Sequence, residues 1–209
     1  ETMTLTEIAQ QIDEDIPKPH RDVFHDGVAH SIVIAEKGYP DKVLPKVKQY
    51  ARISNQSLYN GVRIGFWRLY KDDPLQGVAL ASAYPEEYHN ALFEEFGWLL
   101  DTQYIDTLND GWLQWKSTVP QRSQCSLAHG IVRGWWMNQL TIQQLSQQHL
   151  IEETRKISDC TMMVWRGLSW AGVLILGEET DEWRRLVAQL SADEQQAARR
   201  VQKEDILWE

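Results

Sequence analysis

Two pairs of residues in the sequence combine a carboxylate with an imidazole at a spacing of three. Asp22 precedes His25 in the first pair, and Glu86 precedes His89 in the second. Residues three apart on a helix lie on the same face, so each pair could offer two ligands to one metal ion. The sequence therefore contains the parts of a candidate metal site.

A carboxylate-bridged metal centre needs more ligands than these four residues. Di-iron carboxylate bundles use two Glu-x-x-His pairs together with a bridging glutamate from each of two other helices. Glu7 or Glu14 could supply one bridge, but the helices between the two pairs fall mainly in a segment that has no acid. A metal-dependent helical-bundle enzyme is thus an alternative interpretation, and no cofactor is predicted.

Residues for covalent catalysis are not arranged in a complete set. Cys125 and His129 are four residues apart, so a thiol–imidazole pair on one helix face is geometrically possible. The sequence has no Gly-rich phosphate loop, GxSxG elbow or HExxH motif. Cys125 and Cys160 also lack CxxC spacing, and without a visible signal peptide we expect two buried free thiols. These features favour a protein without catalytic activity.

The clearest indication of a partner is a basic segment between residues 42 and 71. It has no acid, although the formal net charge of the whole protein is −9. A local positive field attracts anionic surfaces even when the molecule as a whole is acidic. We expect the cations to form an exposed patch, on two neighbouring helices, that binds the acidic surface of another protein. These cations are Lys42, Lys46, Lys48, Arg52, Arg63, Arg68 and Lys71.

Aromatic residues alternate with the cations of this basic segment. Cations neutralise phosphates and aromatic rings stack on bases, so the composition also suits single-stranded nucleic acid. The negative remainder of the chain would repel a long polyanion, and the motifs of the common RNA-binding modules are absent. Binding of single-stranded nucleic acid is therefore a second alternative, and nucleic acid is not the expected partner. The aromatic residues are Tyr50, Tyr59, Phe66, Trp67 and Tyr70.

Two adjacent tryptophans, Trp135 and Trp136, are further candidates for binding. Neighbouring positions on a helix point about 100° apart, so we expect one of the two indoles to be exposed. An exposed tryptophan commonly anchors a protein interface. With the seven cations, these residues complete the predicted binding site.

Helix signals dominate the chain. Thr4-x-x-Glu7 is a capping box that begins one helix, and Pro85 begins another. Residues 161–176 form the most apolar stretch, which contains a single charge and predicts the central helix of the core. Strand signals are weak by comparison. We therefore predict an all-α protein, a compact bundle of about eight to ten helices.

The domain prediction is one helical domain over residues 1–209. It has N-terminal helices in 1–40, a basic helical segment in 41–72 and a Trp-rich helical core in 73–209. Gly65, Gly97, Gly134 and Gly167 recur at intervals of 32, 37 and 33 residues, each followed closely by a tryptophan. Intervals in the thirties are typical of helical-hairpin repeats, so an irregular repeat array is an alternative.

Location and function follow from these observations as expectations. The apolar stretch of sixteen residues is shorter than the roughly 20 that span a bilayer. With no apolar signal segment near the N-terminus, we expect a cytoplasmic protein that does not enter the membrane. The best-supported function is that of a non-catalytic interaction protein, an adaptor, regulator or inhibitor of a partner protein.

Overall fold

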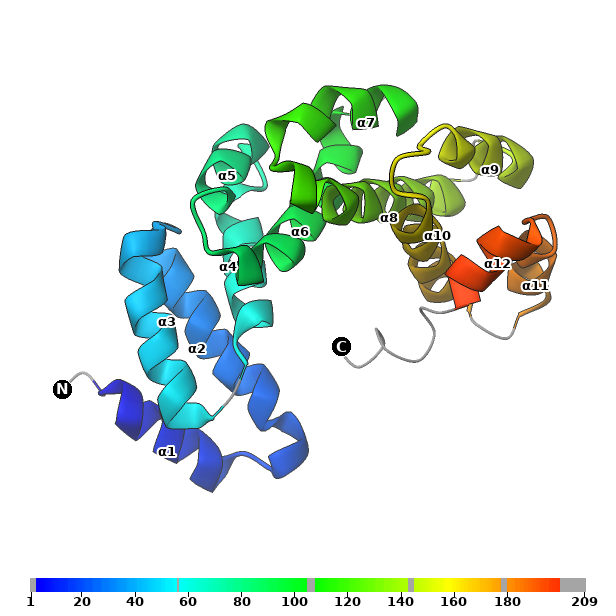
Figure 1. The fold of residues 1–209 in the computed structure, drawn as a ribbon. Helices are drawn as coiled ribbons and strands as arrows, with labels where there is room; N and C mark the ends of the chain where they lie inside the picture. The colour runs from blue at the N-terminus through cyan, green and yellow to red at the C-terminus, as the bar shows by residue number, and fades with distance from the viewer. Residues whose placement is uncertain (1–2, 56, 105–107, 143–144, 178–179, 200–209) are drawn as a thin grey trace. The chain divides into compact units, whose positions relative to one another are not determined.

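The computed structural model describes residues 3–55, 57–104, 108–142, 145–177 and 180–199. These described residues form twelve α-helices and no strand, which confirms the predicted all-α class (Figure 1). Twelve helices are slightly more than the predicted eight to ten. Several are short, including α5 (Pro74–Ala81), α7 (Leu108–Trp115) and α11 (Asp181–Val187). A helix of about two turns shows too few apolar repeats to be counted reliably from sequence.

The chain divides into two compact units, residues 1–92 and residues 93–209, and the boundary falls within α6 (Glu86–Tyr104). The first unit also contains α1 (Leu5–Asp15), α2 (Arg21–Ala35), α3 (Pro40–Ser54), α4 (Tyr59–Tyr70) and α5. The second unit also contains α7, α8 (Gln124–Ile142), α9 (Gln147–Arg155), α10 (Thr161–Leu176), α11 and α12 (Ala192–Arg199). A single domain over residues 1–209 remains a prediction.

Helix α2 is the centre of the N-terminal unit and contacts α1, α3 and α4. Glycines of α4 let the backbones of α2 and α4 approach closely. A Cβ atom at Gly61 would lie 2.2 Å from the carbonyl oxygen of Asp26, and one at Gly65 would lie 2.7 Å from Cβ of Val33. The Asp26 carboxylate also accepts a 2.9 Å hydrogen bond from the Gly61 amide. The Asp26 carboxyl group is partly buried where α2 and α4 cross, and this burial raises its pKa.

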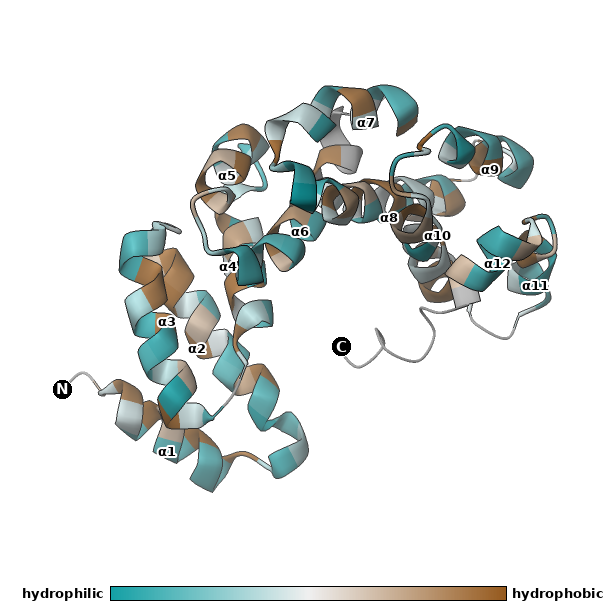
Figure 2. Ribbon diagram, viewed as in Figure 1, coloured by the Kyte–Doolittle hydropathy of each residue, from teal (hydrophilic) through white to brown (hydrophobic). Residues whose placement is uncertain are grey.

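Helix α8 is the central helix of the C-terminal unit. Every residue from 126 to 136 is buried, because helices cover α8 on several sides and α10 packs along it. Figure 2 shows apolar residues along α8 and α10 and a more polar surface on α9 and α12. Within the described part of the chain, no helix combines the length and apolar character needed to cross a membrane.

The apolar helix α10 has the predicted bounds, Thr161–Leu176, and contacts α8, α9, α11 and α12, but it is less completely buried than α8. Its Leu168 and Ala171 are fully buried, whereas Met162, Leu174 and Ile175 are exposed. The exposed fraction of Leu174 is 47%, so Leu174→Ala is expected to cost little stability. The prediction rested on the apolar sequence alone, which does not show how much of the helix its neighbours leave exposed.

Three of the glycines that recur along the sequence, Gly65, Gly97 and Gly167, lie at helix crossings. Gly65 lies against α2, and a Cβ atom at Gly167 would lie 2.6 Å from the carbonyl oxygen of His129 in α8. Gly97 of α6 faces α8, where the glycine opposite it is Gly130 rather than Gly134. The small residue in each of these cases allows two helix backbones to approach.

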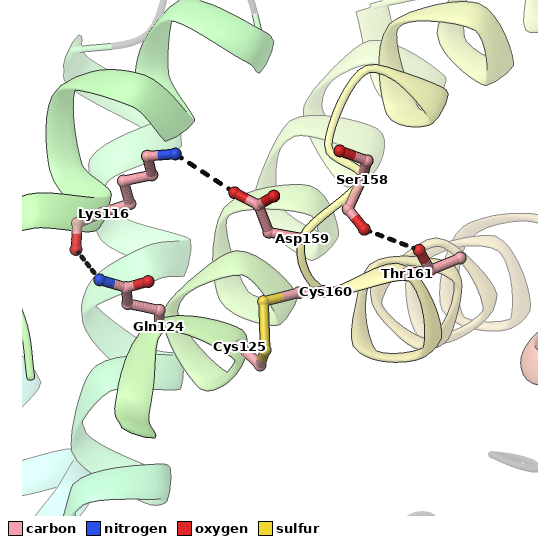
Figure 3. The surroundings of a disulfide bond; sticks show 7 residues. All are labelled: Lys116, Gln124, Cys125, Ser158, Asp159, Cys160 and Thr161. Carbon is pink, nitrogen blue, oxygen red and sulfur yellow. Dashed lines mark hydrogen bonds and ion pairs between the residues drawn. A yellow bond between two sulfur atoms is a disulfide. The ribbon is translucent and has the colours of Figure 1, made fainter. Parts of the chain in front are cut away.

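A disulfide joins Cys125, in the first turn of α8, to Cys160, the residue that precedes α10 (Figure 3). The prediction of two free thiols is therefore wrong. The two Cα atoms lie 5.2 Å apart, within the usual range for a disulfide. Helices α8 and α10 pack side by side with their N-terminal ends together, so two residues that are 35 apart in sequence meet, which sequence spacing alone does not reveal. Beside the bond, the ammonium group of Lys116 lies 3.2 Å from the Asp159 carboxylate.

Candidate functional site

The two pairs predicted to bind metal do not come together. His25 is buried, and its Nδ1 lies 2.8 Å from the hydroxyl of Tyr50 on α3. His89 is also buried, and its Nε2 donates a 2.7 Å hydrogen bond to the carbonyl oxygen of Tyr84. Among the described residues, no group of three or more potential ligands could hold a metal ion. The prediction of a shared metal site is therefore wrong.

Each of these histidines has a role in packing instead. The Nε2 atom of His25 lies 3.9 Å from the carboxylate of Asp13, so this ring links α1, α2 and α3. Burial raises the pKa of its partner Tyr50 to about 12, so the hydroxyl keeps its proton to a more alkaline pH than that of an exposed tyrosine. The carboxylates of both pairs, Asp22 and Glu86, are exposed in the first turns of their helices. Acidic residues at a helix N-terminus interact favourably with the helix dipole, which accounts for their position.

The seven cations of the basic segment lie on α3, on α4 and directly after α4. All except Arg63 are exposed, as predicted for a hydrated face. Their helices both contact α2. Among the apolar residues of the segment, Val43 and Val47 are buried, Leu69 is half-buried and Ile64 is exposed. The segment thus presents most of its charge to solvent while α3 anchors to the core.

Several of these cations already contact a neighbouring side chain. Lys46 forms an ion pair with Glu36, and Lys71 forms one with Asp72. The ammonium group of Lys42 lies 5.5 Å from the ring centre of Tyr39. Exposed cations that form no hydrogen bond or ion pair with any described residue are Lys48, Arg52 and Arg68. These three are therefore the members of the basic segment best placed to interact with another molecule.

The aromatic rings interleaved with the cations are mostly not accessible. Tyr50, Phe66 and Tyr70 are buried, with exposed fractions of 0, 1 and 7%. Phe66 and Tyr70 pack against each other with ring centres 5.4 Å apart. Bases can stack only on rings that face solvent. This arrangement removes most of the stacking surface on which the single-stranded nucleic-acid alternative depended.

Both Trp135 and Trp136 are buried, so the prediction that one of them is exposed is wrong. The Trp136 indole N–H donates a 2.8 Å hydrogen bond to the hydroxyl of Thr154 on α9. Adjacent helical positions do point in different directions, but α8 is enclosed on several sides and both directions lead into protein. Because both indoles are buried, Trp135 and Trp136 do not form the predicted binding surface.

An ionic cluster inside the C-terminal unit was not predicted from the sequence. The Glu94 carboxylate of α6 lies 3.2 Å from Nδ1 of His129 and 3.2 Å from Nη1 of Arg133, both on α8. The Arg133 guanidinium also lies over the indoles of Trp98 and Trp170, 4.8 and 3.5 Å from the ring centres. The two α8 residues are four apart, so the sequence indicates that they share one helix face. Their partners on α6 and α10 could not be predicted, because tertiary packing determines which residues lie beside them.

An apolar groove in the N-terminal unit was also missed. It has a volume of about 480 Å³ and lies between α1 and α2. Two of its lining residues, Val23 and Phe24, are 67 and 48% exposed. The sequence signal was present, since these apolar residues lie off the buried stripe of α2. The groove is lined by Ile8, Ile12, Val23, Phe24, Gly27, Val28 and Ser31.

Comparisons with protein families, with curated proteins and with solved structures find no significant match to this chain. The all-α class is thus established by the structure, and a function has to be proposed from the surfaces described above.

Proposed function

We propose that this chain is a non-catalytic interaction protein, an adaptor, regulator or inhibitor that binds the acidic surface of another protein. The observation that carries the proposal is the exposed basic segment, in which Lys48, Arg52 and Arg68 have no described ionic partner. An exposed cation that is not neutralised within its own chain retains its field for a partner. Complementary charge across an interface gives specificity and speeds association.

A double charge reversal tests the basic segment. Lys48→Glu combined with Arg52→Glu should change the free energy of unfolding by less than about 1 kcal/mol, since exposed charges contribute little to stability. It should abolish capture of the partner from an extract of the host, measured by quantitative mass spectrometry. Capture by the unchanged protein should fall as salt rises, because salt screens exposed charges.

The matched control is Lys18→Glu combined with Arg185→Glu, which alters net charge by the same amount at exposed positions outside the basic segment. This control variant should retain the partner. Equal capture by both double variants across the salt series would contradict the proposal, because the cations of the basic segment would then have no specific role in binding.

The proposed location is the cytoplasm, where we expect the disulfide between Cys125 and Cys160 to be reduced. A reducing cytoplasm does not sustain structural disulfides, whereas oxidising compartments do. The structure joins the two residues. Acid quenching of intact host cells, alkylation of the denatured protein and mass spectrometry of the cysteine-containing peptides decide between these states. Modification of both residues is the result that a cytoplasmic location predicts, and an unmodified pair would contradict that location.

A further inference from the structure

The groove between α1 and α2 is a second surface with the properties of a binding site, separate from the basic segment. Ile8 and Ile12 line it from α1, and Phe24 and Val28 line it from α2. The one hydroxyl in the lining belongs to Ser31, which donates a 2.8 Å hydrogen bond to the carbonyl oxygen of Gly27. The Ser31 hydroxyl already has a hydrogen-bond partner within the chain, so an apolar occupant would not leave it without one.

The dimensions of the groove suit a helix. On α2 the lining runs from residue 23 to residue 31, which corresponds to about 12 Å at the usual rise of 1.5 Å per residue. This length matches two turns of an amphipathic helix that inserts apolar residues at i, i+3 or i+4 and i+7. A Cβ atom at Gly27 would meet nothing within 4 Å, so the groove is open above this residue.

The acidic residues beside the groove favour a helix that carries positive charge. Helix α1 has four acids, Glu7, Asp13, Glu14 and Asp15, and no lysine or arginine. Asp15 is seven residues after Ile8 and therefore lies close to the same face of α1 as this lining residue. Asp13 interacts with Arg21 at 3.5 Å, whereas Asp15 is exposed. A cationic side chain next to the apolar face of an occupant would therefore meet favourable charge along α1.

We propose that the groove between α1 and α2 binds a basic amphipathic helix of a partner protein. The apolar face of that helix lies over Gly27 between Ile8 and Phe24, and its lysines or arginines lie beside α1. This surface is opposite in charge to the basic segment, so it extends the proposed function to a second contact with different chemistry.

The test uses a fluorescently labelled helical peptide with leucines at i, i+3, i+4 and i+7 and lysines at the remaining positions. Fluorescence anisotropy should show that it binds the full chain more tightly than a peptide with glutamate in place of lysine. Gly27→Leu should weaken binding at least tenfold, because Gly27 lines the groove and a Cβ atom there would meet nothing within 4 Å, which leaves room for a side chain that blocks the occupant. The control Ala35→Leu, an exposed position at the end of α2 outside the lining, should leave binding unchanged.

Charge variants test the second half of the proposal. Asp15→Lys should weaken binding of the lysine peptide by up to about fivefold, the usual limit for one exposed ion pair. Asp41→Lys, the same change at an exposed position on α3, should have no effect. The Lys48→Glu and Arg52→Glu variant should also bind the peptide normally, so failure of the groove and failure of the basic segment can be told apart.

Three outcomes would overturn the proposal. In the first, the lysine and glutamate peptides bind equally and Gly27→Leu has no effect. In the second, the protein dimerises with rising concentration and Gly27→Leu prevents it, which would make a second copy the occupant. In the third, the protein binds vesicles of neutral phosphatidylcholine and Gly27→Leu abolishes that binding, which would assign the groove to a lipid surface.

Discussion

Gly130→Ala is expected to destabilise the C-terminal unit by more than about 3 kcal/mol, a large effect for one methyl group. The added Cβ would lie 1.9 Å from the carbonyl oxygen of Glu94 and 2.9 Å from the backbone nitrogen of Trp98. Both obstructing atoms belong to the backbone of α6, so no side-chain rotation relieves the overlap and the two helices must separate. Separation would also pull the Glu94 carboxylate away from His129 and Arg133.

Denaturant unfolding followed by circular dichroism would measure this loss. Gly27→Ala is the matched control, because its Cβ would meet nothing within 4 Å on an exposed position of α2. Replacing glycine by alanine inside a helix without a clash should add up to about 1 kcal/mol of stability. If both variants proved as stable as the unchanged protein, the close crossing of α6 and α8 would be wrong.

Sequence reasoning succeeded where a local rule determines local structure. The capping box at Thr4 and Glu7 is present, with both reciprocal hydrogen bonds. The bounds of α10 were predicted from the apolar run and the glycine that follows it, Gly177, which has a φ of 88°. A positive φ is accessible to glycine at little cost, so a glycine after an apolar run is a reliable stop signal.

The errors share one physical cause, since helical periodicity gives the direction of a side chain but not what lies in that direction. Trp135 and Trp136 point differently, as predicted, yet α8 has protein on several sides and both are buried. Leu174 belongs to the most apolar helix, yet its side chain is exposed. Periodicity alone would identify an exposed apolar face only if the neighbours of each helix were already known.

Predictions of chemistry failed for a related reason, because the partner of a polar group is chosen by tertiary contacts. The i, i+3 spacing of Asp22 and His25 is real, but Tyr50, 25 residues further along the chain than His25, is the group that His25 contacts. Spacing of three residues places the two ligands of one pair on the same helix face. It does not determine whether two such pairs, on different helices, lie close enough to share a metal ion. Exposed charge was easier to predict, since hydration requires no partner, and Lys48 and Arg52 are exposed as expected.

Removal of the disulfide is expected to cost about 4 kcal/mol of stability, because the bond closes a loop of 35 residues and restricts the unfolded chain. Cys125→Ser combined with Cys160→Ser should show this loss in denaturant unfolding. The enclosed loop contains α9, which contributes the Thr154 hydroxyl that accepts the Trp136 indole N–H. Opening the loop in the unfolded state thus increases the entropy that has to be lost before α9 can dock on α8.

Reduction supplies the internal control for this prediction. A thiol reductant should lower the stability of the unchanged protein by the same amount and leave the double serine variant unaffected. Equal stability of the oxidised protein and the serine variant would mean that packing alone joins the start of α8 to α10. A loss on reduction would instead show that the C-terminal unit depends on the bond, and its folded population would then follow the redox state of the compartment that holds it.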